Sequence, residues 1–209
     1  MVILYEIIRG SSACSDGRTP GVTAPSCEIQ TRMIQRAYDM TGLIPNDTVY
    51  VEAHGTGTTL GDRIEATALH KPLCTGKQKE KKLYIGGVKT NVGHTESVAG
   101  LVSLIKAVLM LEKKMIPPHT TFASPNSNIP LRDWGMEVPQ KMLRWPEGAV
   151  RRVLVNSFGY GGTNAHTILD AAEGYLNNRK QAVALHPRPN AGEPLSCWCS
   201  SKRDAVGPG

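Results

Sequence analysis

The sequence predicts an α/β fold, and three observations support that prediction. Short apolar runs at 48–51 and 83–85 are typical of buried strands. Longer segments at 26–41 and 97–113 repeat apolar residues every three or four positions, as helices do. Strands and helices alternate along a chain of 209 residues, 40% hydrophobic and 20% charged, which is enough to bury one core. This order is expected of a sheet covered by helices.

Local signals predict each element of the first quarter. A strand is predicted at Val2–Ile8 from its apolar residues. Ser26 can cap a helix that runs to about Thr41, and Gly42 can end that helix.

The same signals predict the remaining elements. A short helix from about Asp62 to His70 follows the strand at 48–51, and its positive end stabilises the Asp62 carboxylate. The strand at 83–85 leads to a helix from about Ser97 to Lys113, whose broad apolar stripe indicates a buried element. The stripe comprises Val98, Leu101, Val102, Ile105, Val108 and Leu109, and the last two predicted strands are 152–157 and 165–169.

Three loops carry polar residues beside predicted strands. Glu52-Ala-His-Gly-Thr-Gly-Thr58 follows one strand, and Lys89-Thr-Asn-Val-Gly-His94 follows the next. The third loop, Asn156-Ser-Phe-Gly-Tyr-Gly-Gly-Thr-Asn-Ala-His166, is rich in glycine. Glycine lets the backbone approach a ligand, and histidine N–H groups can stabilise charge on a carbonyl oxygen. We therefore expect a site for carbonyl chemistry.

These motifs, together with Gly61-Asp62, resemble the C-terminal half of a beta-ketoacyl synthase domain, a condensing-enzyme family. The stretch from Asp133 to Pro146 is most similar to the ketosynthase of a fungal highly reducing, iterative type I polyketide synthase. The resemblance implies a thiolase-like layered fold (α-β-α-β-α), partial and mainly its C-terminal half. It assigns residues 1–176 to this portion and leaves 177–209 as a linker-like or disordered tail.

The resemblance also implies catalytic roles for three residues. His54 and His94 match histidines whose Nε–H groups stabilise the enolate that forms when a malonyl thioester loses carbon dioxide. Lys89 matches the lysine that orients the second histidine and its hydrogen bonds. A single departure lies nearby, because Arg63 stands where the family usually has a proline suited to a first helical turn.

Substrate and partner expectations follow from the same resemblance. Thr56 and Thr58 match hydroxyls that contact the pantetheine arm, and Phe158 matches a mobile loop near the acyl pocket. No cofactor is expected on the chain itself, since phosphopantetheine arrives on the acyl carrier protein. The expected partners are that carrier protein and the N-terminal half of a ketosynthase, and the intact family domain is expected to be a homodimer.

The family's cysteine nucleophile is expected to be absent. Ser12-Ala-Cys14-Ser15 imitates its motif, but the turn signal Asp16-Gly-Arg-Thr-Pro-Gly21 follows, not an apolar helix. No neighbouring residue supplies the environment that activates a thiolate. Two functions therefore remain open. The first is a condensing acyltransferase half that joins acyl and malonyl thioesters, and the second is a non-catalytic truncated remnant that binds a partner or a pantetheine arm.

Other signals lead to expected absences. The net charge of +6 comes partly from 77–82 and is interpreted as a solvated loop, without nucleic-acid binding. Five irregularly spaced cysteines favour a reducing compartment, and Cys197-Trp-Cys199 lacks the second pair that zinc requires. The longest apolar stretch is too short to span a bilayer, so we expect a cytoplasmic protein. His166 is interpreted as a structural residue bonded to a neighbouring loop, and His70, His119 and His186 as surface residues.

Overall fold

The computed structural model describes residues 6–19, 21, 24–76 and 81–176. Six strands form one mixed sheet in the order β1-β8-β7-β2-β3-β5. The antiparallel part consists of β1 (Glu6–Ser15), β8 (Thr163–Ala171) and β7 (Arg152–Phe158). Parallel neighbours continue from β7: β2 (Tyr50–Glu52), β3 (Leu83–Gly86) and β5 (Met136–Glu137). A small second sheet pairs β4 (Met115–Ile116) with β6 (Leu143–Arg144).

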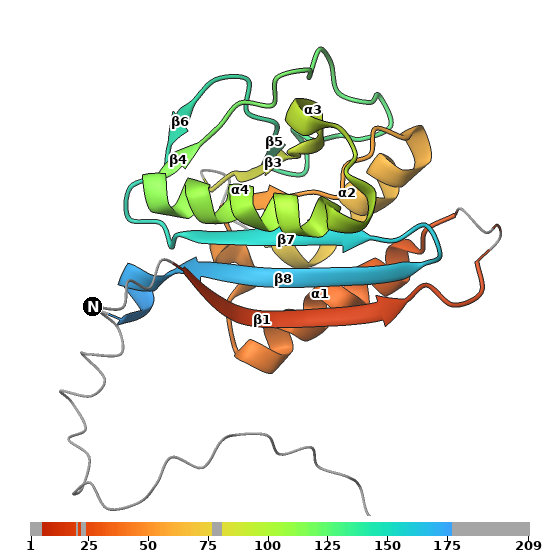
Figure 1. The fold of residues 1–209 in the computed structure, drawn as a ribbon, viewed down its shortest axis with the longest axis horizontal. Coiled ribbons are helices and arrows are strands. Elements are labelled where there is room, and N and C mark those ends of the chain that lie inside the picture. Colours follow the sequence, from red (N-terminus) through yellow and green to blue (C-terminus); the bar gives the residue numbers. More distant parts are fainter. Residues whose placement is uncertain (1–5, 20, 22–23, 77–80, 177–209) are drawn as a thin grey trace, which may run out of the picture.

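Helices cover the two faces of the large sheet. On one face α1 (Cys27–Thr41) packs on α2 (Thr59–Leu73) and on β1 and β8. On the other face α4 (Ala99–Lys113) packs along β7 and β8. Figure 1 shows α4 lying along β7 while α1 crosses behind β8 and β1. Short turns complete the described part: η1 (Pro45–Asp47), α3 (Lys89–Val92) and η2 (Glu96–Val98).

The strands supply two cores because successive side chains point to opposite faces of a sheet. Val51 and Leu154 face the cluster formed with α1 and α2. Tyr50 and Val153, the residue before each, face the cluster formed with α4. The arrangement is therefore one helix–sheet–helix sandwich, which confirms the predicted α/β class.

The first helix begins and ends where the sequence predicts. Ser26 accepts a hydrogen bond from the Ile29 backbone N–H through its hydroxyl (3.3 Å), which satisfies one of the free donors at the helix start. Gly42 adopts φ 63°, the left-handed conformation common just past a helix end.

The first strand lies later than predicted. Residues 1–5 are outside the described part, and β1 continues to Ser15 through a polar stretch that lacks apolar alternation. Pairing decides its length, since Glu6 to Ser15 run antiparallel to β8, with a register shift between Ile8 and Gly10. A side chain at Gly10 would meet Thr41 Cγ2 at 2.5 Å, so α1 packs closely there.

The second helix is longer than predicted at both ends. It begins at Thr59 and continues through Pro72 to Leu73, whose side chain is fully buried. Arg63 is therefore the fifth helical residue, not part of a first turn. The predicted helix from Asp62 to His70 was too short because the tight turn before it already supplies the cap.

The apolar stripe of α4 is only partly buried, contrary to the prediction. Ala99, Ser103, Ala107, Met110 and Leu111 face the sheet. The larger apolar residues of the opposite side remain exposed: Leu101 (56%), Ile105 (53%) and Leu109 (46%), with Val98 (48%) just before the helix. A helix that is apolar on both sides fits a position between two layers of structure. The large sheet is one such layer, and the described residues provide no second one over the exposed side of α4.

Several expectations fall on residues outside the described part. They include the tail at 177–209, the Cys197–Cys199 pair and His186. Across the described ranges, no helix combines the length and apolar character needed to cross a bilayer. Within the same ranges, no cluster of three or more histidine, cysteine or acidic residues is placed to hold a metal ion.

Candidate active site

His54 follows β2 and is held by a buried carboxylate. Glu65, on α2, accepts the His54 backbone N–H through Oε1 and the Gly55 backbone N–H through Oε2, both at 2.9 Å. Gly55 and Gly57 adopt positive φ values of 45° and 81°, which other residues rarely tolerate. The loop therefore turns sharply beneath a fixed histidine.

His94 follows α3 and is exposed at the surface of the isolated chain. Gly93 precedes it with φ 74°, a backbone conformation that favours glycine. The Nδ1 atom of His94 accepts a hydrogen bond from the Glu96 backbone N–H at 3.1 Å. This contact fixes the orientation of the ring.

The two imidazole rings meet at the edge of the sheet. Their centroids are 5.8 Å apart, with an angle of 82° between the planes. The Nδ1 atom of His54 also accepts a backbone N–H, from Phe158 at 3.3 Å, and the Phe158 ring centroid lies 5.3 Å from that of His54. An accepting Nδ1 carries no proton, so each neutral ring carries its proton on Nε2. The site therefore presents two Nε2–H donors.

Charges near the histidines favour the neutral form of His54. Burial lowers the pKa of His54 to about 4, and the positive charges of Lys89 and His94 act in the same direction. Burial also lowers the pKa of Lys89, while the carboxylates of Glu65 and Glu52 oppose that shift. The structure thus brings His54 and His94 together, as expected from the sequence. Lys89 is close enough to His54 to lower its pKa, but it lines a different cavity from the two histidines.

Behind His54 lies a buried polar network that the sequence reasoning missed. Asn156, on β7, donates through Nδ2 to Glu65 Oε1 at 2.8 Å, and its Oδ1 contacts His166 Nδ1 at 2.7 Å. Burial raises the pKa of Glu65, and the hydrogen bonds that it accepts from three N–H groups offset part of this shift. In the sequence, the one signal that could have indicated this network was Glu65 itself, a charged residue among the buried apolar positions of α2. His166 is buried as a structural residue, but its partner lies on the adjacent strand, not on a loop.

The predicted substrate-binding residues line a cavity of about 1070 Å³. His54, His94 and Phe158 line it together with Thr56 and Thr58. Both threonines are exposed, and the Thr58 hydroxyl also caps α2 by accepting the Gly61 backbone N–H at 3.2 Å. A chain-like polar ligand could pass these hydroxyls on its way to the histidines.

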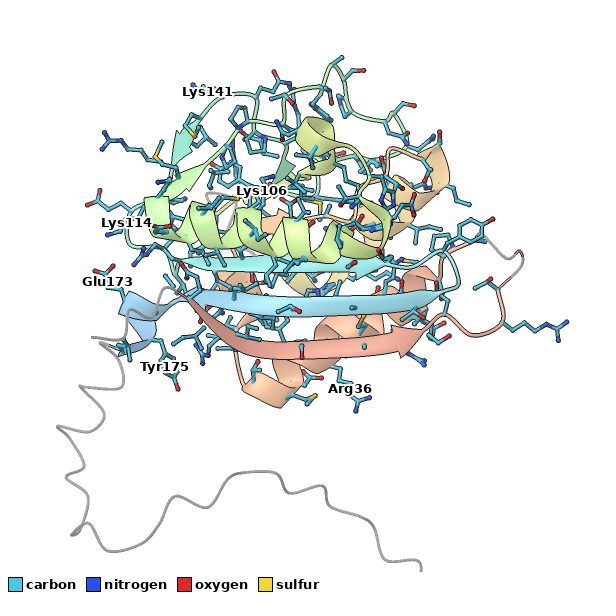
Figure 2. The ribbon with its side chains drawn as sticks, viewed as in Figure 1. Arg36, Lys106, Lys114, Lys141, Glu173 and Tyr175 are labelled. Atoms are coloured by element: carbon cyan, nitrogen blue, oxygen red, sulfur yellow. The ribbon has the colours of Figure 1, made fainter. Side chains whose placement is uncertain are left out.

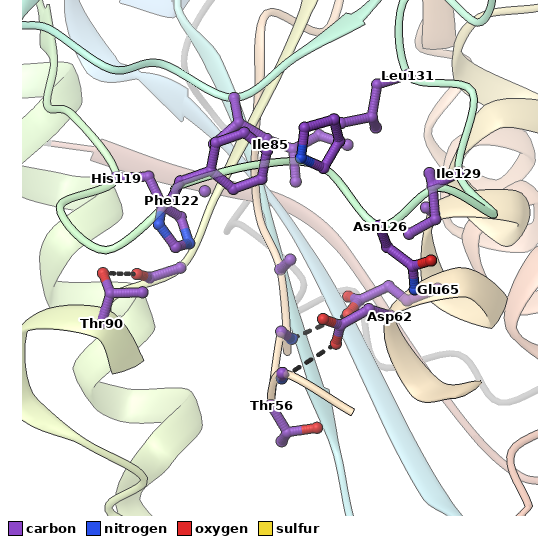
Figure 3. A pocket seen from close by; sticks show the side chains of 18 of the residues that line it. Thr56, Asp62, Glu65, Ile85, Thr90, His119, Phe122, Asn126, Ile129 and Leu131 are labelled. Carbon is purple, nitrogen blue, oxygen red and sulfur yellow. Dashed lines mark hydrogen bonds between the residues drawn. The ribbon is translucent and has the colours of Figure 1, made fainter. Parts of the chain in front are cut away.

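A second cavity of about 890 Å³ shares the loop residues Thr56 and Thr58 with the first. Figure 3 shows the carboxylates of Asp62 and Glu65 directed toward the loop backbone, with His119 across the space. Asp62 accepts the Gly57 backbone N–H at 3.1 Å, as a further restraint on this loop.

Two histidines expected at the surface are partly buried. His119 lines the second cavity, and its Nδ1 atom is inaccessible to solvent. His70 stacks on the Trp134 ring with centroids 4.6 Å apart. The surface prediction was wrong for both because packing of the 117–135 segment covers them.

Cys14 lies outside this arrangement. It lies near the end of β1, paired opposite Asn164 of β8, and not at the start of a helix. Burial raises the pKa of its thiol, with the Asn164 side chain opposing. It does not line the cavity that contains the histidines.

Comparisons with known proteins agree with this geometry. Residues 5–123 match the family profile "Beta-ketoacyl synthase, C-terminal domain", and residues 125–207 match "Ketoacyl-synthetase C-terminal extension". The chain is 50% identical over 176 residues to the highly reducing polyketide synthase Preu1 of Preussia isomera, covering 84% of this chain and 7% of that protein. It is 48% identical over 215 residues to the highly reducing polyketide synthase ausV of Aspergillus calidoustus, covering 97% and 8%.

Solved structures give the same result. The ketosynthase from module 6 of the bacillaene synthase of Bacillus subtilis 168 superposes with a TM-score of 0.77 at 32% identity, over 90% of this chain and 37% of that chain. Ketosynthase twelve of the bacillaene polyketide synthase of Bacillus amyloliquefaciens gives 0.75 at 40% identity, over 79% and 30%. The chain thus spans less than half of each ketosynthase and under a tenth of the fungal synthases. It belongs to the beta-ketoacyl synthase family and has the C-terminal part of that family's thiolase-like fold.

Proposed function

We propose that this chain supplies the histidine half of a ketosynthase site for polyketide synthesis. The observation that carries the proposal is the matched pair of Nε2–H donors on His54 and His94. Each ring accepts a backbone N–H at Nδ1 and leaves Nε2–H free to act on a ligand. Two such donors on adjacent rings suit an oxygen on which negative charge develops.

The reaction follows from this arrangement. In a malonyl thioester, the bond to the carboxylate breaks and carbon dioxide leaves. The electron pair stays on the remaining fragment as an enolate, whose charge lies on the thioester oxygen. His54 and His94 would donate to that oxygen. The enolate carbon would then attack the carbonyl carbon of an acyl thioester, so that a C–C bond forms, the C–S bond breaks and the thiolate of the nucleophile leaves. Loss of one donor of this kind typically slows a reaction by about 10²–10³-fold.

Substrate delivery is assigned to the cavity of about 1070 Å³. We infer that the pantetheine arm of an acyl carrier protein enters past Thr56 and Thr58, with Phe158 at the acyl end. The positive charge of the Lys89 ammonium would keep His54 in its neutral form, since it is close enough to lower the pKa of that ring.

The nucleophile is assigned to another segment. Cys14 lies on a strand, has a raised pKa and does not line the cavity. The thiolate is the reactive form of cysteine, and a helix N-terminus or a nearby cation normally promotes it. We infer that an N-terminal ketosynthase half carries the nucleophile.

That half would dock on α4. The helix exposes Leu101, Ile105 and Leu109 on one side, and Val98 lies exposed just before it, each residue between 46% and 56% exposed. An exposed apolar face of this kind marks an interaction surface. The chain also matches only 37% of a ketosynthase chain, so much of the family fold remains for a second body.

Carbon dioxide release from a malonyl carrier-protein thioester tests the catalytic proposal. The full chain is assayed with a separately produced N-terminal ketosynthase half, and intact mass reports acylation. His54→Ala and His94→Ala should each lower release about 10²-fold or more, whereas His70→Ala, a matched control on α2, should not. Equal release by all variants would refute the histidine roles. No release from any mixture, with a stable complex formed, would favour a non-catalytic remnant.

Light scattering and size-exclusion chromatography test the docking surface. Leu101→Glu should abolish binding of the N-terminal half, while Met40→Glu, which changes an exposed methionine on α1, should not. Self-association of the chain that Leu101→Glu abolishes would instead assign the α4 face to a second copy.

A further inference from the structure

A second buried carboxylate connects the two histidine loops. Glu52 ends β2, two residues before His54, and its side chain is fully buried. Its Oε1 atom accepts the backbone N–H of Val88, the residue immediately before Lys89. One side chain on the first loop therefore holds the start of the segment that ends at His94.

An ammonium from a third element neutralises this carboxylate. Lys106, labelled on α4 in Figure 2, places Nζ 2.7 Å from Glu52 Oε2, and its side chain is only 14% exposed. Nζ also donates to the Tyr50 hydroxyl at 2.9 Å, and that hydroxyl donates to Glu52 Oε2 at 3.2 Å. The Glu52 carboxylate thus receives three donors from three segments.

Stability alone does not explain the pair. Replacing a buried ion pair by apolar residues is often neutral or stabilising, so such a pair is weak evidence for a contribution to folding. Its position is more informative. The carboxylate joins β2, the start of α3 and α4, and those elements carry or flank Lys89 and both histidines.

We propose that Glu52 is a positioning residue, whose side-chain oxygen fixes the loop of Lys89 and His94 relative to His54 through the Val88 backbone N–H, with Lys106 as its charge partner. This role rests on the proposed function, because only that function gives the two Nε2–H donors a common target, the enolate oxygen. Neither side chain lines the cavity that contains the two histidines. Lys106 balances the charge of Glu52, and the side-chain oxygen of Glu52 holds Val88.

Two variants separate positioning from charge balance. Val88→Pro removes the donated N–H and leaves the ion pair intact, and Val88 already has φ −67°, which proline adopts. Glu52→Gln with Lys106→Met removes both charges but keeps an amide oxygen that can accept the Val88 N–H. If the ion pair served folding alone, the double variant should be disturbed more than Val88→Pro.

The first readout is the NMR spectrum of the histidine rings in the full chain. We expect Val88→Pro to shift or broaden the His94 ring nitrogen signals, and the double variant to retain them. Lys114→Met, which removes an exposed partner of Glu173, is the control and should leave them unchanged. Unchanged His94 signals in Val88→Pro, or lost signals in the double variant, would overturn the proposal.

The second readout is carbon dioxide release in the complemented assay. Val88→Pro should lower kcat by about tenfold to a hundredfold, as small misplacements of reacting groups do, with KM for the carrier protein unchanged. The double variant should stay within about threefold of wild type, a difference of less than 1 kcal/mol. Ring signals that respond to Val88→Pro while His54→Ala leaves release intact would support the positioning role and refute the proposed function.

Should Val88→Pro fail to fold, Glu52→Leu with Lys106→Met removes the acceptor without leaving a buried charge. It should shift the same His94 signals, whereas the Gln–Met pair should not. Identical His94 signals in these two double variants would also overturn the proposal.

Discussion

Replacing Glu65 by glutamine should destabilise the chain strongly, although the two side chains have the same shape. The Glu65 carboxylate accepts three N–H groups, from the backbones of His54 and Gly55 and from Asn156 Nδ2. Glutamine offers one acceptor oxygen, so its NH₂ group would face at least one of these donors. That donor would lose its partner.

The expected cost is about 2–4 kcal/mol, because a hydrogen bond to a charged group contributes about 1.5–3 kcal/mol and an unsatisfied buried donor costs about 1–3 kcal/mol. A typical domain has only about 5–15 kcal/mol of stability. Urea unfolding should therefore show a large loss: with a slope of roughly 2 kcal/mol per molar, the midpoint should fall by about 1–2 M.

Glu28→Gln is the matched control. Glu28 pairs with Arg32 on the surface of α1, where its side chain is 70% exposed. Exposed pairs of this kind contribute about 0–1 kcal/mol, so the midpoint should hardly change. A Glu65→Gln midpoint equal to that of the control would refute the role assigned to the carboxylate, and the His54 ring signals should shift only in Glu65→Gln.

Three further predictions concern pH, packing and capping. Burial lowers the pKa of His166 to about 3, against about 6.5 in an unfolded chain, so the folded state binds fewer protons below neutral pH. The free energy of unfolding should therefore fall by about 2 kcal/mol from this residue between pH 7 and pH 5, and His166→Asn should flatten the profile from urea titrations; parallel profiles would contradict this. Gly86→Ala should cost about 1–3 kcal/mol because its Cβ would lie 2.3 Å from the Tyr50 hydroxyl, and the cost should be smaller beside Tyr50→Phe. Thr58→Ala should remove the α2 cap at a cost of about 1 kcal/mol and lower Tm by about 2–4 °C; an unchanged melting curve would show that the cap contributes nothing.

The sequence by itself was sufficient for the class of fold and for the loops of the site. Apolar periodicity predicted the alternating strands and helices, and local chemistry located α1, because Ser26 and Gly42 act on neighbouring backbone groups. His54, His94 and Lys89 could be selected because their motifs are short and continuous.

Tertiary structure decided what depends on contacts between distant segments. Nothing local in the polar residues before Ser15 predicts a strand, and pairing with β8 made them one. Glu65, Glu52 and Lys106 were missed because their charges acquire meaning only from partners up to 91 residues away. Likewise, periodicity showed that α4 is apolar, but only packing could show which side the sheet covers, because a repeating pattern carries no information about which layers are present.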